Sequence, residues 1–167
     1  LFLSVGLLAA IISLGVQGFR ALTSEQLAAT VEVQKLAEQR FQAVFTFPDG
    51  VIRTFELAGD EFSVEAKIVK WHPWANFIGL QTAYELDRVS GRYTLLDDEQ
   101  TQPRTVYSLG RTRAVNLFSL SQRLPGLSAL IDAQYGSSTF TPANDESRYQ
   151  VRVSATGLLV REITEID

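Results

Sequence analysis

The residues best suited to chemistry gather in one stretch, Lys70–Leu80, which reads KWHPWANFIGL. It contains both tryptophans of the chain and its only histidine, His72. A histidine can act as a general base near neutral pH, bind a metal or ligate a haem iron, and flanking tryptophans could pack on a porphyrin. Each of these roles needs partner groups, so the rest of the chain decides what His72 can do.

No set of catalytic partners accompanies His72. A serine hydrolase needs a nucleophile, a base and an orienting acid, and the elbow-like stretch at 126–130 (GLSAL) lacks the final glycine of the motif. Zinc needs three or four His, Cys or carboxylate ligands, and no second haem ligand is evident. Asp97, Asp98 and Glu99 lie in an expected polar turn, open to water. We therefore predict that the protein is not an enzyme and holds no cofactor or metal.

The composition narrows the remaining functions. The chain has 167 residues, 46% of them hydrophobic, which is enough for the core of one compact domain. Its net charge of −4 gives no basic face, so we expect no nucleic-acid partner. The absence of cysteine excludes disulfides and thiol catalysis. Methionine is absent even at position 1, so we expect a few natural residues to precede Leu1.

Without catalytic partners, the corner that contains Trp71, His72, Trp74 and Phe77 has three interpretations. Pro73 stops strand pairing, so these aromatic residues follow the end of a strand. The rings could close one end of the core, because aromatic side chains bury large apolar areas. They could instead lie at the headgroup level of a membrane, or anchor a partner protein. The four residues are therefore a candidate partner or membrane interface.

An uncharged apolar stretch at the start of the chain favours a membrane location. Residues Leu1–Phe19 carry no charge, and as a helix they would extend about 28 Å, close to the hydrocarbon thickness of a bilayer. The alternatives are a cleaved signal peptide and a buried core helix, but the following residues, RALT, form no small-x-small cleavage site. We therefore predict a transmembrane anchor over residues 1–22.

One face of the predicted anchor is rich in small and polar residues, namely Gly6, Ala9, Ala10, Ser13 and Gln17. Small residues at helical spacing let a second helix approach closely, and Ser or Gln can hydrogen-bond across the contact. The alternative is that such residues are simply frequent in membrane helices. A single span cannot form a solute pathway alone. The expected partners are therefore other membrane protein subunits and the lipid bilayer.

After the anchor, the apolar pattern predicts first a helix and then strands. A capping sequence at residues 23–26 and a moderate apolar stripe predict an amphipathic stalk helix over residues 23–41. From residue 42 the apolar period is two, which is typical of strands. We predict strands over 42–47, 51–57, 62–71, 79–87, 88–95, 104–109, 138–141, 149–155 and 158–162, and helices over 115–124 and 127–135. The expected fold class is α+β, in which residues 42–167 form a mainly antiparallel β-sheet domain with one or two helices.

Four segments carry a resemblance to a known family. They are KIVKWHPWANFIGLQTAYELDRVSGRY (67–93), PRTVYSL (103–109), DAQYGSSTFTP (132–142) and YQVRVSATGLLVRE (149–162). In these segments the chain resembles an uncharacterised family of proteobacterial single-span membrane proteins, often labelled cation or multidrug efflux pumps. The resemblance implies a bacterial inner-membrane location and assigns no catalytic residue.

These features predict a non-catalytic, single-pass accessory subunit that packs against and stabilises a larger complex in the bacterial inner membrane. The alternative is a membrane-tethered domain that binds or senses a ligand or lipid, with its pocket under Trp71, Trp74 and Phe77. Basic and acidic residues are interleaved after the apolar stretch. Their charges therefore leave open on which side of the membrane the domain lies.

Overall fold

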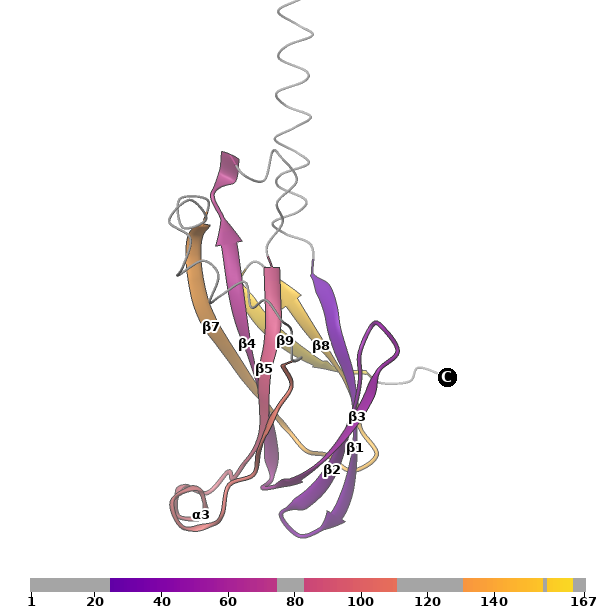
Figure 1. Cartoon of the computed structure of the whole chain (residues 1–167). Helices are drawn as coiled ribbons and strands as arrows, with labels where there is room; N and C mark the ends of the chain where they lie inside the picture. Colours follow the sequence, from indigo (N-terminus) through magenta and orange to yellow (C-terminus); the bar gives the residue numbers. More distant parts are fainter. Residues whose placement is uncertain (1–24, 75–82, 111–130, 155, 164–167) are drawn as a thin grey trace, which may run out of the picture.

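The computed structural model describes residues 25–74, 83–110, 131–154 and 156–163, which form two antiparallel β-sheets (Figure 1). Sheet A has the strand order β3-β2-β1-β8-β9, and sheet B has the order β6-β5-β4-β7. The strands of sheet A are β1 (Gln26–Ala37), β2 (Arg40–Thr46), β3 (Ile52–Ala58), β8 (Arg148–Ser154) and β9 (Gly157–Glu162). Those of sheet B are β4 (Glu61–Trp71), β5 (Ala83–Arg92), β6 (Val106–Ser108) and β7 (Ile131–Pro142). A short helix, α3 (Leu96–Thr101), follows β5.

The core lies between the two sheets, where alternate side chains of the central strands point inward. In β4 this places Phe62, Val64 and Ile68 in the interior. The Phe62 ring lies 5.5 Å from the ring of Tyr149 and 6.4 Å from that of Phe41, measured between centroids. Because Tyr149 and Phe41 belong to sheet A, these ring contacts join the two sheets.

The hairpin predicted around the Pro-Asp-Gly turn is confirmed. β2 and β3 pair antiparallel, and the Phe47 amide donates to the Val51 carbonyl at 2.9 Å. Gly50 has a φ of +82°, which glycine adopts readily and other residues rarely do. The strand predicted over residues 62–71 is confirmed as β4, and the last two predicted strands as β8 and β9.

The stalk helix predicted over residues 23–41 is wrong in its described part, most of which forms the central strand β1, while Arg40 and Phe41 begin β2. β1 pairs with β2 on one side and with β8 on the other. Val31 and Val33 are buried, and β-branched residues suit a strand packed on one face. A bulge near the start of β1 buries the consecutive residues Ala28 and Ala29. Because of this bulge, the buried residues of β1 do not alternate regularly, and their spacing in the sequence resembles that of a helix.

Three further predictions differ from the structure. The helix predicted over 127–135 is wrong for residues 131–135, which begin β7 and pair with β4. The two strands predicted over 79–95 are replaced by the single strand β5 across Ala83–Arg92. The turn expected at Asp97–Glu99 lies inside α3.

The predicted anchor over residues 1–22 and the predicted helix over 115–124 lie outside the described residues. Among the residues that are described, no helix is both long and apolar enough to cross a membrane. The coarser prediction is confirmed, because the described chain is a mainly antiparallel β-sheet domain with one short helix.

The two sheets meet along two different seams. On one side β7 lies beside β9, and the Leu158 amide donates to Ser137 Oγ at 2.9 Å. On the other side Arg53 of β3 donates to the carbonyls of Ser108 and Leu109 at 2.8 and 3.3 Å. We call this second side the β3–β6 seam. Across it, only side chains connect the two edge strands in the described part of the chain.

Candidate functional site

One end of the sandwich carries both the start of the described chain and the aromatic corner. β1 begins at this end, where the Tyr84 hydroxyl of β5 donates to the Leu27 carbonyl at 3.5 Å. β4 ends there, with Trp71 paired to Ile131, the first residue of β7. We call this the proximal end. It lies at the top of Figure 1, and α3 marks the opposite, distal end.

The proximal end presents part of the aromatic corner that the sequence singled out. Trp71 is the last residue of β4 and is partly buried, whereas Trp74 follows the strand with 51% of its surface exposed. Nδ1 of His72 lies 3.5 Å from Oδ1 of Asp132, so the two form an ion pair when the histidine is protonated. The Trp74 ring does not close the core. Its exposed face can contact a membrane surface or a partner protein.

The other predicted site residues lie outside the described part of the chain. These are Phe77 of the aromatic corner and the five residues of the predicted helix-packing face, Gly6, Ala9, Ala10, Ser13 and Gln17. The structure therefore brings Trp71, His72 and Trp74 together at one end. The packing face of the anchor stays a prediction.

An ion cluster that the sequence did not indicate fixes the start of β1. The carboxylate of Glu25 accepts two hydrogen bonds from Arg161 of β9, at 2.7 and 2.9 Å. Nε of Arg152, in β8, lies 3.2 Å from the same carboxylate. Glu25 and Arg161 are 136 positions apart, so only the fold reveals their pairing. The cluster ties residue 25 to two strands of sheet A.

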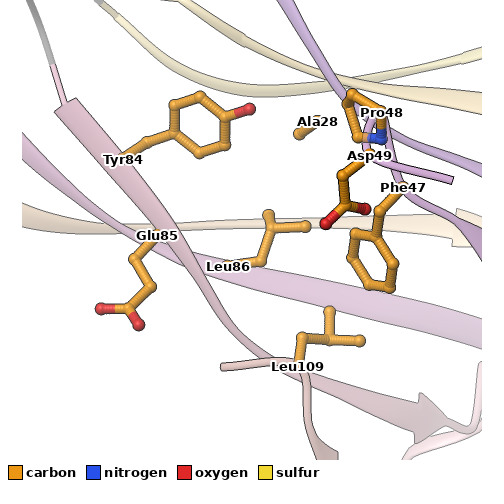
Figure 2. A pocket seen from close by; sticks show the side chains of 8 residues that line it. All are labelled: Ala28, Phe47, Pro48, Asp49, Tyr84, Glu85, Leu86 and Leu109. Atoms are coloured by element: carbon orange, nitrogen blue, oxygen red, sulfur yellow. The ribbon is translucent and has the colours of Figure 1, made fainter. Parts of the chain in front are cut away.

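A partly open cavity of about 300 Å³ lies between the sheets near the proximal end (Figure 2). It is lined by Ala28, Phe47, Pro48, Asp49, Tyr84, Glu85, Leu86 and Leu109. Figure 2 shows the Asp49 carboxylate pointing toward Leu86 and the Phe47 ring, while Glu85 points away. Burial raises the pKa of the Tyr84 hydroxyl. The cavity is large enough for a short alkyl chain or a ring, and neither Trp71 nor Trp74 lines it.

Two of the three acidic residues of α3 have structural roles. Glu99 accepts a hydrogen bond from the Tyr93 amide at 2.8 Å, and Asp98 accepts one from the side chain of Gln39 at 2.9 Å. These contacts hold α3 against the end of β5 and the β1–β2 turn. Within the described ranges, no group of three or more His, Cys, Asp or Glu side chains is arranged to hold a metal ion.

Comparison of the chain with protein-family models, with curated proteins and with solved structures gives no match. The proximal end, the cavity and the strand edges are therefore the features from which a function can be inferred.

Proposed function

We propose that the protein is a non-catalytic, single-pass accessory subunit of a larger complex in the bacterial inner membrane. The observation that carries the proposal is the exposed Trp74 ring at the proximal end, where the chain continues into the predicted anchor. Tryptophan favours the headgroup level of a bilayer and is enriched at the centres of protein interfaces. A domain held with this end toward the membrane would bring Trp74 to either environment.

The Glu25 cluster supports a fixed rather than a loose attachment. Two arginines on neighbouring strands hold the first described residue by charge-assisted hydrogen bonds and an ion pair. A helix that entered the sheet at this point would have a defined direction relative to the sandwich. Such an attachment suits a subunit whose anchor and domain contact one partner together.

Native-membrane crosslinking tests this proposal. The chain has no cysteine, so single cysteines at Gly6 or Ala10 on the predicted packing face give position-specific crosslinkers. We expect both to capture the same neighbouring membrane protein. Cysteines at Leu8 and Ile12, on the opposite helix face, are the matched controls and should capture it poorly. A protein that migrates alone in mild detergent, with no capture at Gly6 or Ala10, would refute the proposal.

The cavity favours a second candidate, a membrane-tethered domain that binds the alkyl part of a lipid. The supporting observation is its apolar wall of Phe47, Leu86 and Leu109 near the proximal end. Full-length protein purified in nanodiscs should then take up octanol, and Leu86→Trp, which fills the space, should weaken binding at least about tenfold. Val33→Ile, in the core outside this cavity, is the control. Equal octanol binding by all three proteins would exclude this candidate.

A further inference from the structure

The outer edge of β3 has a defined row of outward-facing backbone groups. In an antiparallel ladder, successive residues direct their N–H and C=O groups to opposite sides of the strand. The Phe47 amide bonds to the Val51 carbonyl, which sets the phase of the hairpin. Counting from Val51, the backbone groups of Ile52, Thr54 and Glu56 point away from β2.

An independent contact confirms this phase. Ala58 belongs to the same alternate set, and its amide donates outward to Thr105 Oγ1 at 2.9 Å. Among the described residues, no such partner is present for the backbone amides of Ile52, Thr54 and Glu56. An unpaired edge of this length is a template for another strand.

Exposed apolar side chains line the same edge. Ile52 is 63% exposed and Val106, on the facing strand β6, is 51% exposed. Val51 beside them is also exposed, and Tyr107 is partly exposed while its ring packs on that of Phe55, 5.4 Å away between centroids. β-branched and aromatic side chains of this kind are the ones that stabilise cross-strand pairing. Their concentration on the β3–β6 seam marks a surface suited to a strand.

On the other seam, the outward amide at the start of β9 is bonded across to sheet B. By the same counting from the Ile163 amide, which donates to the Arg148 carbonyl, the Leu158 amide of β9 points outward. Ser137 of β7 accepts that bond. On the β3–β6 seam, the Arg53 side chain donates to the Ser108 and Leu109 carbonyls and uses no backbone group of β3.

We propose that the β3 edge is a docking site for one extended segment of a different polypeptide, which adds to sheet A as a further strand. This inference rests on the accessory function proposed above and names the element that contacts the partner. Main-chain hydrogen bonds to Ile52, Thr54 and Glu56 supply the affinity, and alternate side chains supply the specificity.

The membrane anchor argues against a second copy as the occupant. β3 runs in the same direction as β1, away from the proximal end, because each pairs antiparallel with β2. Antiparallel pairing of two β3 edges, the arrangement of all strand pairs described, would turn the second copy upside down. The two predicted anchors would then point in opposite directions and could not share one bilayer.

The outward-facing side chains of β3 define the chemistry of the added segment. Its residue beside Ile52 should be apolar and its residue beside Thr54 should be β-branched, which are favourable cross-strand neighbours. Glu56 pairs with Arg40 on its inner side and is exposed on its outer side. A lysine or arginine of the segment beside Glu56 would complete the charge complementarity.

A displayed library of random decapeptides, selected on the full-length chain in phosphatidylethanolamine–phosphatidylglycerol nanodiscs, tests the proposal. We expect enriched peptides with alternating β-branched residues and one basic residue.

Thr54→Pro removes the central outward N–H but no bond to β2, and should weaken binding of the best peptide at least about tenfold. Thr54→Val keeps the N–H and should bind within about twofold of wild type. Glu162→Pro, an outward position on the β9 edge, should bind like wild type.

Thermal melts show whether Thr54→Pro remains folded. If it does not, the test uses Thr54→Val with and without a second change, Ile52→Cys, that carries a bulky label. The unlabelled protein should bind the peptide, and the labelled protein should lose that binding. The proposal fails if no peptide is enriched over empty nanodiscs, or if folded Thr54→Pro binds equally well. It also fails if Thr54→Cys forms a disulfide dimer in membranes, because a second copy then occupies the edge. If cysteines at Gly6 and Ala10 still capture the neighbouring membrane protein in these cases, the accessory function remains supported. Failure of the docking site and failure of the accessory function are therefore distinguishable.

Discussion

At the scale of single residues, Glu25 is the most informative, because it lies where sheet A meets the predicted anchor. Hydrogen bonds from Arg161 lower the pKa of its carboxyl group, against the opposing effect of partial desolvation. Arg161 and Arg152 also lower it through their positive charges. The charged carboxylate is therefore the form that holds the start of β1 to β8 and β9.

We predict that Glu25→Gln destabilises the protein near neutral pH and that this loss disappears in acid. A carboxyl group with a lowered folded-state pKa contributes stability above its unfolded value of 4.5, and this contribution is lost as the pH falls through the folded value. The difference in melting temperature between wild type and variant should be full at about pH 7 and absent at about pH 2. Circular dichroism of the full-length chain in detergent measures it.

Glu32→Gln is the control for this experiment, because Glu32 forms an ion pair with Arg148 in the same sheet, at 2.8 Å. It lacks the two-arginine arrangement, so its substitution should change the melting temperature less. If the effect of Glu25→Gln were the same at both pH values, the side chain would act through packing and not through its charge.

The residue scale also shows what the sequence could indicate about the site. Trp71, His72 and Trp74 were identifiable because rare residue types cluster in one short stretch, and the structure brings them to one end. The pairs Glu25–Arg161 and Arg53–Ser108 join residues that are distant in sequence. No local pattern encodes such contacts, because they depend on which strands become neighbours.

At the scale of elements, local alternation predicted the strands whose partners are adjacent in sequence. β2, β3 and β4 carry regular alternation and clear turn residues, and each pairs with a neighbour in sequence, although β4 also pairs with the distant β7. β1 and the start of β7 were predicted as helices, because their local patterns are irregular; β1 pairs with both the adjacent β2 and the distant β8, and β7 pairs with the distant β4. Their state is decided by tertiary pairing, which overrides a weak local preference.

The irregularities within strands had a similar effect on prediction. The register shift between Leu27 and Ala29 places two neighbouring side chains in the core, which imitates a helical stripe. β5 continues through Ser90-Gly91, although this pair is typical of turns. Glycine is needed at position 91 because a side chain there would block a close contact between the sheets. A turn-like dipeptide therefore had a packing explanation that only the three-dimensional arrangement reveals.

At the scale of the whole molecule, two glycines allow the sheets to meet at the distal end. A Cβ atom on Gly91 would lie 2.0 Å from the Ala58 carbonyl oxygen, and one on Gly59 would lie 2.3 Å from the Arg92 carbonyl oxygen. Gly59 also has a φ of +137°, which strains other residues. These backbone contacts join the end of β3 to the end of β5, at the opposite end of the sandwich from the cavity.

We therefore predict that Gly91→Ala destabilises the protein by about 1–3 kcal/mol or more, because the added methyl group must push two backbones apart. Gly136→Ala is the matched control: Gly136 also lies in a strand of sheet B, and a Cβ atom there meets nothing within 4 Å. That change should stay within about 0.5 kcal/mol. Denaturant midpoints of the full-length chain measure both. Equal stability of the two variants would mean that the sheets do not touch at the distal end.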